Sequence, residues 1–487
     1  MKVTPIIGLE VHVELRTQSK MFCSCSATHF HVEANTHTCP VCLGLPGALP
    51  VPNRTACEWC IKLGIALGCT PNLTSFFERK NYFYPDLAKG YQLTQFEKPF
   101  VINGKLVIDG QEIRINRAHM EEDTGKSIHL TTGGQDLTLI DYNRCGVPLV
   151  EIVSEPDITS AQMAKNYLLK IQQIIRYLGI SDADIEKGSM RCEPTINLKI
   201  ETDDGQTVYT PLAEIKNVAS LTGVQTAIDF ELNRQLEEFK QTGEGKSKTN
   251  KTTRGWDADK NQTFLQREKE GSSDYRYFPE PDIPYINFTQ AEIDVIKTSV
   301  PELPDQKVAK YQDILGLSDY DAASIAQDFS FANVYESVLK SHLSDSNLKD
   351  FAKFTANLFL GAIKTHLNES GKDLDQSKIN SQSFFDLFTA VSNSEISATV
   401  AKQVITESYQ TGVNPIEIAK SKGLIQVSDS GEIEKIAKEV IEANPKAVED
   451  YKKNPMSIGF LIGQLMKASN GSANPKLAKE ILEKLLK

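Results

Sequence analysis

The chain has 487 residues, and 53 Lys and Arg stand against 64 Asp and Glu, which gives a formal net charge of −11. A content of 40% hydrophobic and 24% charged residues argues against wholesale disorder, and the acidic balance argues against a protein that coats nucleic acid through general positive charge. No apolar run approaches the roughly 20 residues of a membrane span. The N-terminus enters an apolar segment without a charged leader, so we expect a cytoplasmic protein.

Residues 1–290 are predicted to form one large α+β domain. Alternation of apolar and polar residues predicts strands at Ile6–Leu15, Lys105–Ile108, Ile113–Arg117 and Leu137–Ile140. Apolar residues at helical spacing predict helices at Arg54–Leu67, Ser160–Leu178 and Leu221–Lys240. Ser160 is typical of a helix N-cap, and Gly179 is typical of the residue that ends a helix.

After Pro284 the pattern changes to amphipathic helices separated by Gly and Pro. This change predicts a helical domain at residues 291–410 and a smaller helical tail domain at residues 411–487. In the tail, apolar residues recur at helical spacing and predict a helix over Ser430–Ala443.

Four cysteines in two close pairs predict a metal site. Cys23 and Cys25 form the first pair, and Cys39 and Cys42 form the second after thirteen intervening residues. Two short pairs of thiolates suit tetrahedral zinc, and four cysteines fill its coordination shell, so the predicted zinc is structural. The alternative is a group of unpaired thiols that merely lie close in the sequence.

Other cysteines and histidines near this motif have a simpler interpretation. Cys57 and Cys60 lie on a predicted helix with apolar neighbours, and we interpret them as core residues. His29, His31 and His37 lie between the two cysteine pairs. They could replace a cysteine as ligands, but we interpret them as exposed loop residues.

The first predicted strand carries a polar face. Side chains alternate along a strand, so Glu10, His12 and Glu14 share the face opposite Leu9 and Val11. Carboxylates and an imidazole on one face can bind a divalent cation or transfer protons. The alternative is a half-buried strand whose polar face is simply solvated.

Two further acidic features could join such a site. Three consecutive acids, Glu121, Glu122 and Asp123, suit Mg²⁺, which takes one or two carboxylates together with water and phosphate oxygens. The alternative is a solvated acidic turn. Glu151 interrupts an apolar run, so it is predicted to enter a core or a cleft.

Cations and aromatic rings alternate in the segments Arg79–Asp86 and Asp274–Asp282. Such interleaving can hold a nucleotide or an RNA end by charge and stacking. A β-hairpin with packed aromatic rings is the alternative. The sequence contains neither a phosphate-binding loop nor a dinucleotide-binding fingerprint. The segment Gly243–Ser247 ends in Lys-Ser, as a phosphate-binding loop does, but its glycine spacing is wrong.

Several long motifs resemble the B subunit of the bacterial-type, tRNA-dependent amidotransferases. They include IGLEVHVEL, CPVCLGLPGALPVPN, RKNYFYPDLAKGYQLTQ, HMEEDTGKS and DYNRCGVPLVEIVSEPD. The resemblance runs from the first strand to the last helix. It implies a cradle-like α+β catalytic domain, an all-helical domain, and a tail domain that contacts tRNA.

The resemblance also implies a division of labour in a heterotrimeric carbon–nitrogen ligase that uses glutamine as its nitrogen donor. An amidase, the A subunit, releases ammonia, and a small belt, the C subunit, ties the other two together. The B subunit binds ATP and Mg²⁺, phosphorylates the side-chain carboxylate of Glu-tRNA(Gln), and in many cases that of Asp-tRNA(Asn), and amidates it with channelled ammonia. A non-catalytic, zinc-containing scaffold that only positions tRNA is the alternative function.

By this resemblance the catalytic and magnesium-binding candidates are Glu10, His12, Glu122 and Glu151, with Glu121 as the weaker member of its pair. The candidates for a substrate pocket or channel mouth are Lys80, Tyr82 and Lys89. Between Tyr451 and Lys487 there are seven Lys but two Glu and neither Arg nor Asp, so an acidic catalytic body is predicted to carry a basic, tRNA-binding tail.

Overall fold

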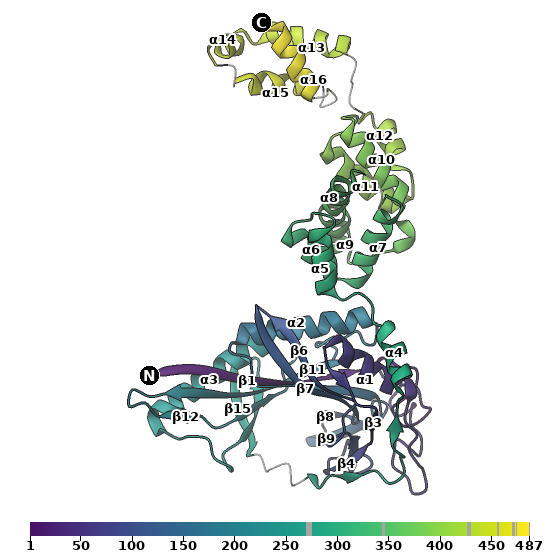
Figure 1. Ribbon diagram of the computed structural model, residues 1–487, viewed down its shortest axis with the longest axis vertical. Coiled ribbons are helices and arrows are strands. Elements are labelled where there is room, and N and C mark those ends of the chain that lie inside the picture. The colour runs from purple at the N-terminus through teal and green to yellow at the C-terminus, as the bar shows by residue number, and fades with distance from the viewer. Residues whose placement is uncertain are drawn as a thin grey trace. The chain divides into compact units, whose positions relative to one another are not determined.

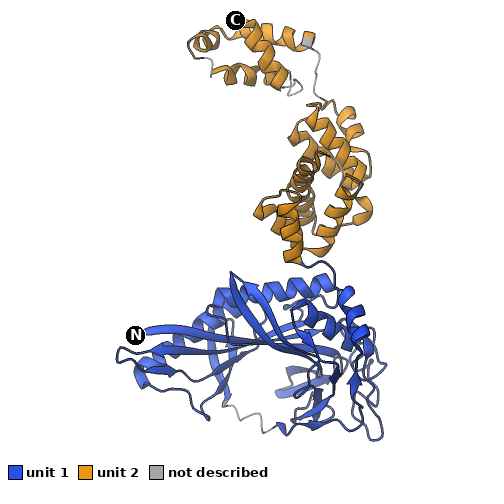
Figure 2. Ribbon diagram, in the orientation of Figure 1, with its two compact units in different colours: residues 1–303 blue, residues 304–487 orange. Residues whose placement is uncertain are grey.

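The computed structural model describes residues 1–268, 275–342, 346–425, 430–454, 457–469, 473 and 475–486. The chain divides into two compact units, Met1–Leu303 and Pro304–Lys487 (Figure 2). A mixed sheet with helices in the first unit, followed by a helical second unit, confirms the predicted α+β class. The finer division into domains at residues 290 and 410 stays a prediction.

A ten-stranded sheet organises the first unit. In spatial order its strands are β15 (Gln262–Glu268), β14 (Thr252–Asp257), β13 (Ala213–Lys216), β11 (Met190–Glu201), β1 (Lys2–Glu14), β10 (Pro148–Ser154), β7 (Gln111–Glu122), β6 (Val101–Ile108) and β2 (Thr70–Pro71), with β12 (Thr207–Tyr209) paired to β11. All these neighbours run antiparallel except β13 and β14.

Helices cover one face of this sheet (Figure 1), and they are α1 (Arg54–Ala66), α2 (Ala161–Leu178) and α3 (Leu221–Thr242). Their positions confirm the three predicted helices. The Ser160 side chain accepts a hydrogen bond from the Met163 amide at 3.1 Å, and Gly179 ends α2 with φ +68°, a conformation that glycine adopts without strain.

The apolar side chains of β1 pack under these helices, because every second residue of a strand points to the same face. Ile7, Leu9, Val11 and Val13 are almost completely buried in the core of the first unit. Cys57 and Cys60 of α1 belong to the same core, as predicted. The polar residues of β1 are therefore left on the opposite face of the sheet.

Short elements lie on that opposite side, where Figure 1 shows β4, β8 and β9. Small sheets are formed by β16 (Phe278–Pro279), β4 (Glu78–Asn81) and β5 (Tyr91–Thr94), by β17 (Ile286–Asn287) and β3 (Thr74–Ser75), and by β8 (Lys126–Thr132) and β9 (Gln135–Asp141). The helix α4 (Gln290–Thr298) adds Ile293 and Ile296 to the core of the first unit.

The second unit is helical. Its α-helices are α5 (Pro304–Asp313), α6 (Asp319–Ala326), α7 (Phe329–Leu339), α8 (Leu348–Leu358), α9 (Lys364–Ser370), α10 (Ser381–Ser392), α11 (Ala398–Thr411), α12 (Pro415–Ser421), α13 (Ser430–Ala443), α14 (Pro445–Lys453), α15 (Ile458–Ala468) and α16 (Pro475–Leu485). One hydrophobic cluster runs from Tyr311 to Ala419, and a separate cluster joins residues between Ile433 and Leu482. Among the described helices, none combines the length and the apolar character required to cross a bilayer.

Candidate active site

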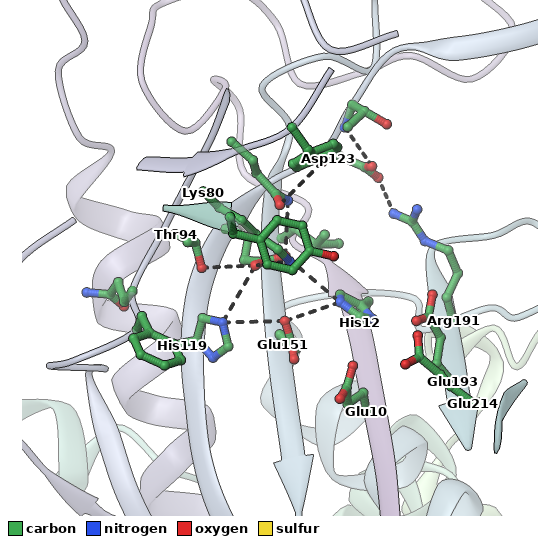
Figure 3. Close-up of a pocket in the computed structure, with 18 of the residues that line it drawn as sticks. Glu10, His12, Lys80, Thr94, His119, Asp123, Glu151, Arg191, Glu193 and Glu214 are labelled. Carbon is green, nitrogen blue, oxygen red and sulfur yellow. Dashed lines mark hydrogen bonds and ion pairs between the residues drawn. The ribbon is translucent and has the colours of Figure 1, made fainter. Parts of the chain in front are cut away.

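A polar cavity of about 410 Å³ opens on the face of the large sheet that the helices leave free. Residues directly opposite each other in antiparallel strands share a face, and the register sets His12 opposite Glu151, Glu151 opposite His119, and Glu10 opposite Glu193. Side chains from β1, β7, β10 and β11 therefore converge on one place (Figure 3).

Two histidines and two carboxylates meet at the centre of the cavity. The Nε2 atoms of His12 and His119 each lie 3.4 Å from Oε2 of Glu151. Nε2 of His12 is also 3.9 Å from Oε2 of Glu121, and Nε2 of His119 is 3.7 Å from Oε1 of Glu121. The strand register thus brings together groups from three strands that are far apart in the chain.

Burial and neighbouring charges shift the pKa values of these groups in opposite directions. Burial alone would lower the pKa of His12, but the carboxylates of Glu151, Glu193 and Glu121 raise it to about 9. Burial would raise the pKa of Glu151, but His119 and His12 hold it well below its ordinary value. The carboxylates therefore stay ionised inside the cavity, where they can attract a cation.

The β4–β5 hairpin fixes Glu121 from the other side. Thr94 Oγ1 donates to Oε1 of Glu121 at 2.9 Å, and Gln92 Nε2 donates to Oε2 at 3.0 Å. The ammonium of Lys80 lies 3.9 Å from Oε1 of Glu121, and the pKa of Glu121 is lowered although burial opposes this, because Lys80 is close. A carboxylate held by this many groups has a defined orientation.

These residues fit a divalent cation. One ligand atom from each of His12, Glu121 and Glu151 lies within 4.8 Å of the others. Two carboxylate oxygens with room for water and phosphate oxygens match the preference of Mg²⁺. Glu10 lies two residues before His12 on the same face of β1 and also lines the cavity (Figure 3).

The aromatic-basic segments form part of the cavity wall. Tyr82, Tyr275 and Tyr277 line the cavity, and the Lys80 ammonium lies 5.2 Å from the centre of the Tyr275 ring. The ring of Tyr277 stacks on Phe96 with 4.6 Å between centroids. Asp274, at the start of the second predicted segment, lies outside the described residues.

The four predicted zinc ligands also come together. Their Sγ atoms lie within 4.8 Å of one another, and those of Cys39 and Cys42 are 3.9 Å apart. A tetrahedral Zn–S distance of about 2.3 Å requires sulfur atoms about 3.8 Å apart, so the donor set fits zinc. The Cys39 amide donates to Cys42 Sγ at 3.1 Å.

Comparison with known proteins shows the family of the chain. Residues 5–294 match the family model described as the GatB/GatE catalytic domain, and residues 339–486 match the one described as the GatB domain. The B subunit of the aspartyl/glutamyl-tRNA(Asn/Gln) amidotransferase of Persephonella marina is 44% identical over 492 residues, which cover 100% of both chains. The chain belongs to the family of amidotransferase B subunits.

Two other relatives carry the same description. The B subunit of Dehalococcoides mccartyi is 43% identical over 490 residues, which cover 99% of this chain and 98% of the relative. That of Thermotoga maritima is 41% identical over 496 residues, with coverage of 100% and 99%. Membership in this family confirms the resemblance drawn from the motifs, and the relatives' description as subunits implies a complex of several chains.

Two candidates that this resemblance had suggested lie outside the cavity. Glu122 follows Glu121 on β7, so its side chain points to the other face of the sheet. It pairs with Lys89 and accepts a hydrogen bond from the Leu93 amide at 3.1 Å, and neither Glu122 nor Lys89 lines the cavity. The structure thus places Glu121 in the cavity and Glu122 outside it.

The interpretation of His29 as an exposed loop residue is wrong. Its Nε2 lies 2.8 Å from Oε2 of the buried Glu14. Glu14 lies beside Arg191, which pairs with Asp123, and both of these line the cavity. The segment between the two cysteine pairs therefore contacts a residue that supports the cavity wall.

Other cavity residues were not recognised as candidates from the sequence. Among them are Arg191, Glu193, Glu214, Lys216 and Lys251. Their segments look like ordinary alternating strands or loops, so no local signal assigned them to a site. The pairing of His12 with Glu151, and of Glu151 with His119, depends on contacts between distant segments.

Proposed function

We propose that this chain activates the side-chain carboxylate of misacylated tRNA, using ATP and Mg²⁺, and then amidates it. The products would be Gln-tRNA(Gln) from Glu-tRNA(Gln) and Asn-tRNA(Asn) from Asp-tRNA(Asn). The observation that carries the proposal is the polar cavity where His12, Glu121 and Glu151 meet opposite Lys80. Membership in the family of amidotransferase B subunits supports it.

The chemistry requires two steps at one place. A carboxylate is a poor acyl donor because oxide is a poor leaving group. Transfer of the terminal phosphoryl group of ATP to a carboxylate oxygen releases ADP and creates an acyl phosphate. Ammonia then attacks the acyl carbon, the amide bond forms, phosphate leaves, and the attacking nitrogen loses a proton.

The residues of the cavity suit these steps. His12, Glu121 and Glu151, extended by Glu10, would hold Mg²⁺, which when bound neutralises charge on a transferring phosphoryl group. The ammonium of Lys80 stays charged, because Glu121 and Glu151 raise its pKa although burial opposes this. Lys80 would then hold the carboxylate or phosphate of the substrate by charge and hydrogen bonds.

The aromatic wall suits the end of a tRNA. Tyr82 and Tyr275 offer rings within the cavity, and a base can stack on such rings. The tail domain at residues 411–487 would contact the tRNA body through the lysines of its basic stretch Tyr451–Lys487.

The remaining parts of the proposal concern partners and zinc. The sequence has no amidase-like serine and lysine signature, so ammonia would come from an amidase, the A subunit, tied to this chain by a small belt, the C subunit, in the cytoplasm. The relatives' description as one subunit of an amidotransferase supports partner chains of this kind. Cys23, Cys25, Cys39 and Cys42 would hold a structural zinc ion, for which their geometry fits.

Glu151→Gln tests the catalytic proposal in the reconstituted heterotrimer. The substitution keeps the shape of the side chain but removes the charge that His12 and His119 contact. We expect a loss of about 100-fold or more in ATP hydrolysis that depends on Glu-tRNA(Gln). Glutaminase activity of the same complex should stay detectable and serves as the control. Unchanged ATP hydrolysis by the variant would show that this cavity is not where the carboxylate is activated.

A further inference from the structure

Lys20 is completely buried beside the cysteine cluster, which consists of Cys23, Cys25, Cys39 and Cys42. Its ammonium donates to the carbonyl of His37 at 2.7 Å and to the carbonyl of Tyr142 at 3.3 Å, and it lies 3.7 Å from Sγ of Cys42. The three contacts come from the segment between the cysteine pairs, from the second cysteine pair, and from the loop that follows β9.

Among the described residues, the partners of the Lys20 ammonium are two carbonyl oxygens and a sulfur, and no carboxylate forms an ion pair with it. An ammonium removed from water is costly unless an anion accompanies it, and lysine is almost never fully buried without a partner. Lys307 in the second unit shows the usual solution, because it is 3% exposed and its ammonium lies 2.7 Å from Oε1 of Glu336.

We infer that Lys20 is a positioning residue of the cysteine cluster, because its buried ammonium donates to Cys42 Sγ and to the carbonyl of His37 between the two cysteine pairs. Four thiolates and one Zn²⁺ carry a net charge of −2, so an adjacent ammonium offsets half of it and stabilises the zinc-loaded cluster. This inference rests on the zinc site of the proposed function.

The position of Lys20 also connects this cluster to a strand of the cavity. The Met21 amide donates to the carbonyl of Gly146 at 2.7 Å, and Gly146 lies just before β10, which carries Glu151. Cys145, beside Gly146, has its Sγ 3.3 Å from the carbonyl oxygen of Cys42. The Lys20 segment therefore joins the cysteine loop to the turn from which the cavity strand starts.

Lys20→Met in the full chain tests the inference, because methionine keeps much of the length of the side chain and removes its charge. We measure zinc content, the rate of zinc transfer to a colorimetric chelator, and the thermal unfolding midpoint before and after zinc removal. The variant should lose zinc about 10–100-fold more readily than the wild type. After zinc removal its midpoint should equal or exceed that of the wild type, because Lys20 then no longer stabilises a zinc-loaded cluster and a buried ammonium is costly.

Two further variants separate this role from simple packing. Lys307→Met should lower the midpoint equally with and without zinc and leave zinc transfer unchanged, because its partner is a carboxylate. Lys20→Arg keeps the charge and should retain zinc at full stoichiometry. The inference is overturned if Lys20→Met holds zinc as the wild type does, if it lowers the midpoint equally with and without zinc, or if Lys20→Arg loses zinc as readily as Lys20→Met.

The same measurements separate this inference from the catalytic proposal. Wild-type protein that contains no zinc, but hydrolyses ATP with Glu-tRNA(Gln) in the heterotrimer, would overturn the inference and leave the catalytic proposal standing. Protein whose zinc retention depends on Lys20, but whose heterotrimer shows no tRNA-dependent ATP hydrolysis, would overturn the catalytic proposal and leave the inference about Lys20 standing.

Discussion

Two neighbouring glutamates on β7 have different surroundings although they are adjacent residues. Glu121 faces the cavity and is held by Thr94, Gln92 and Lys80. Glu122 faces the other side of the sheet and pairs with Lys89. Neither the residue type nor the degree of burial distinguishes the two, because both are glutamates that are 2% exposed.

Isosteric substitutions should separate them. We expect Glu121→Gln to lower ATP hydrolysis that depends on Glu-tRNA(Gln) by about 100-fold or more. Glu122→Gln should retain a larger share of that activity but have a lower thermal unfolding midpoint, because Lys89 would be left without its anion. Steady-state ATP hydrolysis and thermal unfolding of both variants check this, and an equal loss of activity in the two would contradict the assignment.

At the level of the elements, the large sheet of the first unit depends on the close approach of α1 to β6. Gly64 of α1 lies directly against Val101, where an added Cβ would come within 2.3 Å of a valine methyl carbon. The helix can therefore approach the strand only because position 64 carries no side chain. Since β6 pairs with β7, this contact supports the strand that carries His119 and Glu121.

Gly64→Ala should destabilise the protein by about 1–3 kcal/mol, the usual cost of overpacking a core. Gly463→Ala is a matched control in α15, where an added Cβ meets no atom within 4 Å. That control should be neutral or should stabilise by up to about 1 kcal/mol, because alanine favours helix more than glycine does. Urea denaturation monitored by circular dichroism measures both, and a Gly64→Ala variant as stable as the control would contradict the close approach.

Over the whole molecule, charge is unevenly distributed. The chain has a net charge of −11, yet the segment from Tyr451 to the C-terminus is rich in lysine. Lys467, Lys476 and Lys484 are all at least partly accessible to solvent. An acidic body therefore carries a locally basic end, which can contact phosphates without making the whole protein bind nucleic acid.

Replacing Lys467, Lys476 and Lys484 together with glutamine should weaken tRNA binding. We expect KM for Glu-tRNA(Gln) to rise while kcat changes little, because these lysines lie in the second unit and the cavity lies in the first. The slope of log affinity against log salt should fall by up to about 0.7–0.9 per lost phosphate contact. Titrations at several salt concentrations check this, and an unchanged slope would show that the tail makes no phosphate contacts.

The fold class, several of the elements and the family could be predicted from the amino-acid sequence. Alternation and capping residues predicted β1, α1, α2 and α3, because those signals act between residues that are close along the chain. The polar face of β1, with Glu10 and His12, followed from the same local rule.

Which polar residues share a cavity became known only from the three-dimensional arrangement of the chain. The register of β1, β10 and β7 aligns His12, Glu151 and His119, and the β4–β5 hairpin brings Lys80 to Glu121 rather than to Glu122. The contact of His29 with Glu14 and the burial of Lys20 have the same origin. Such contacts depend on how distant strands pair and pack, and no local pattern in the chain specifies them.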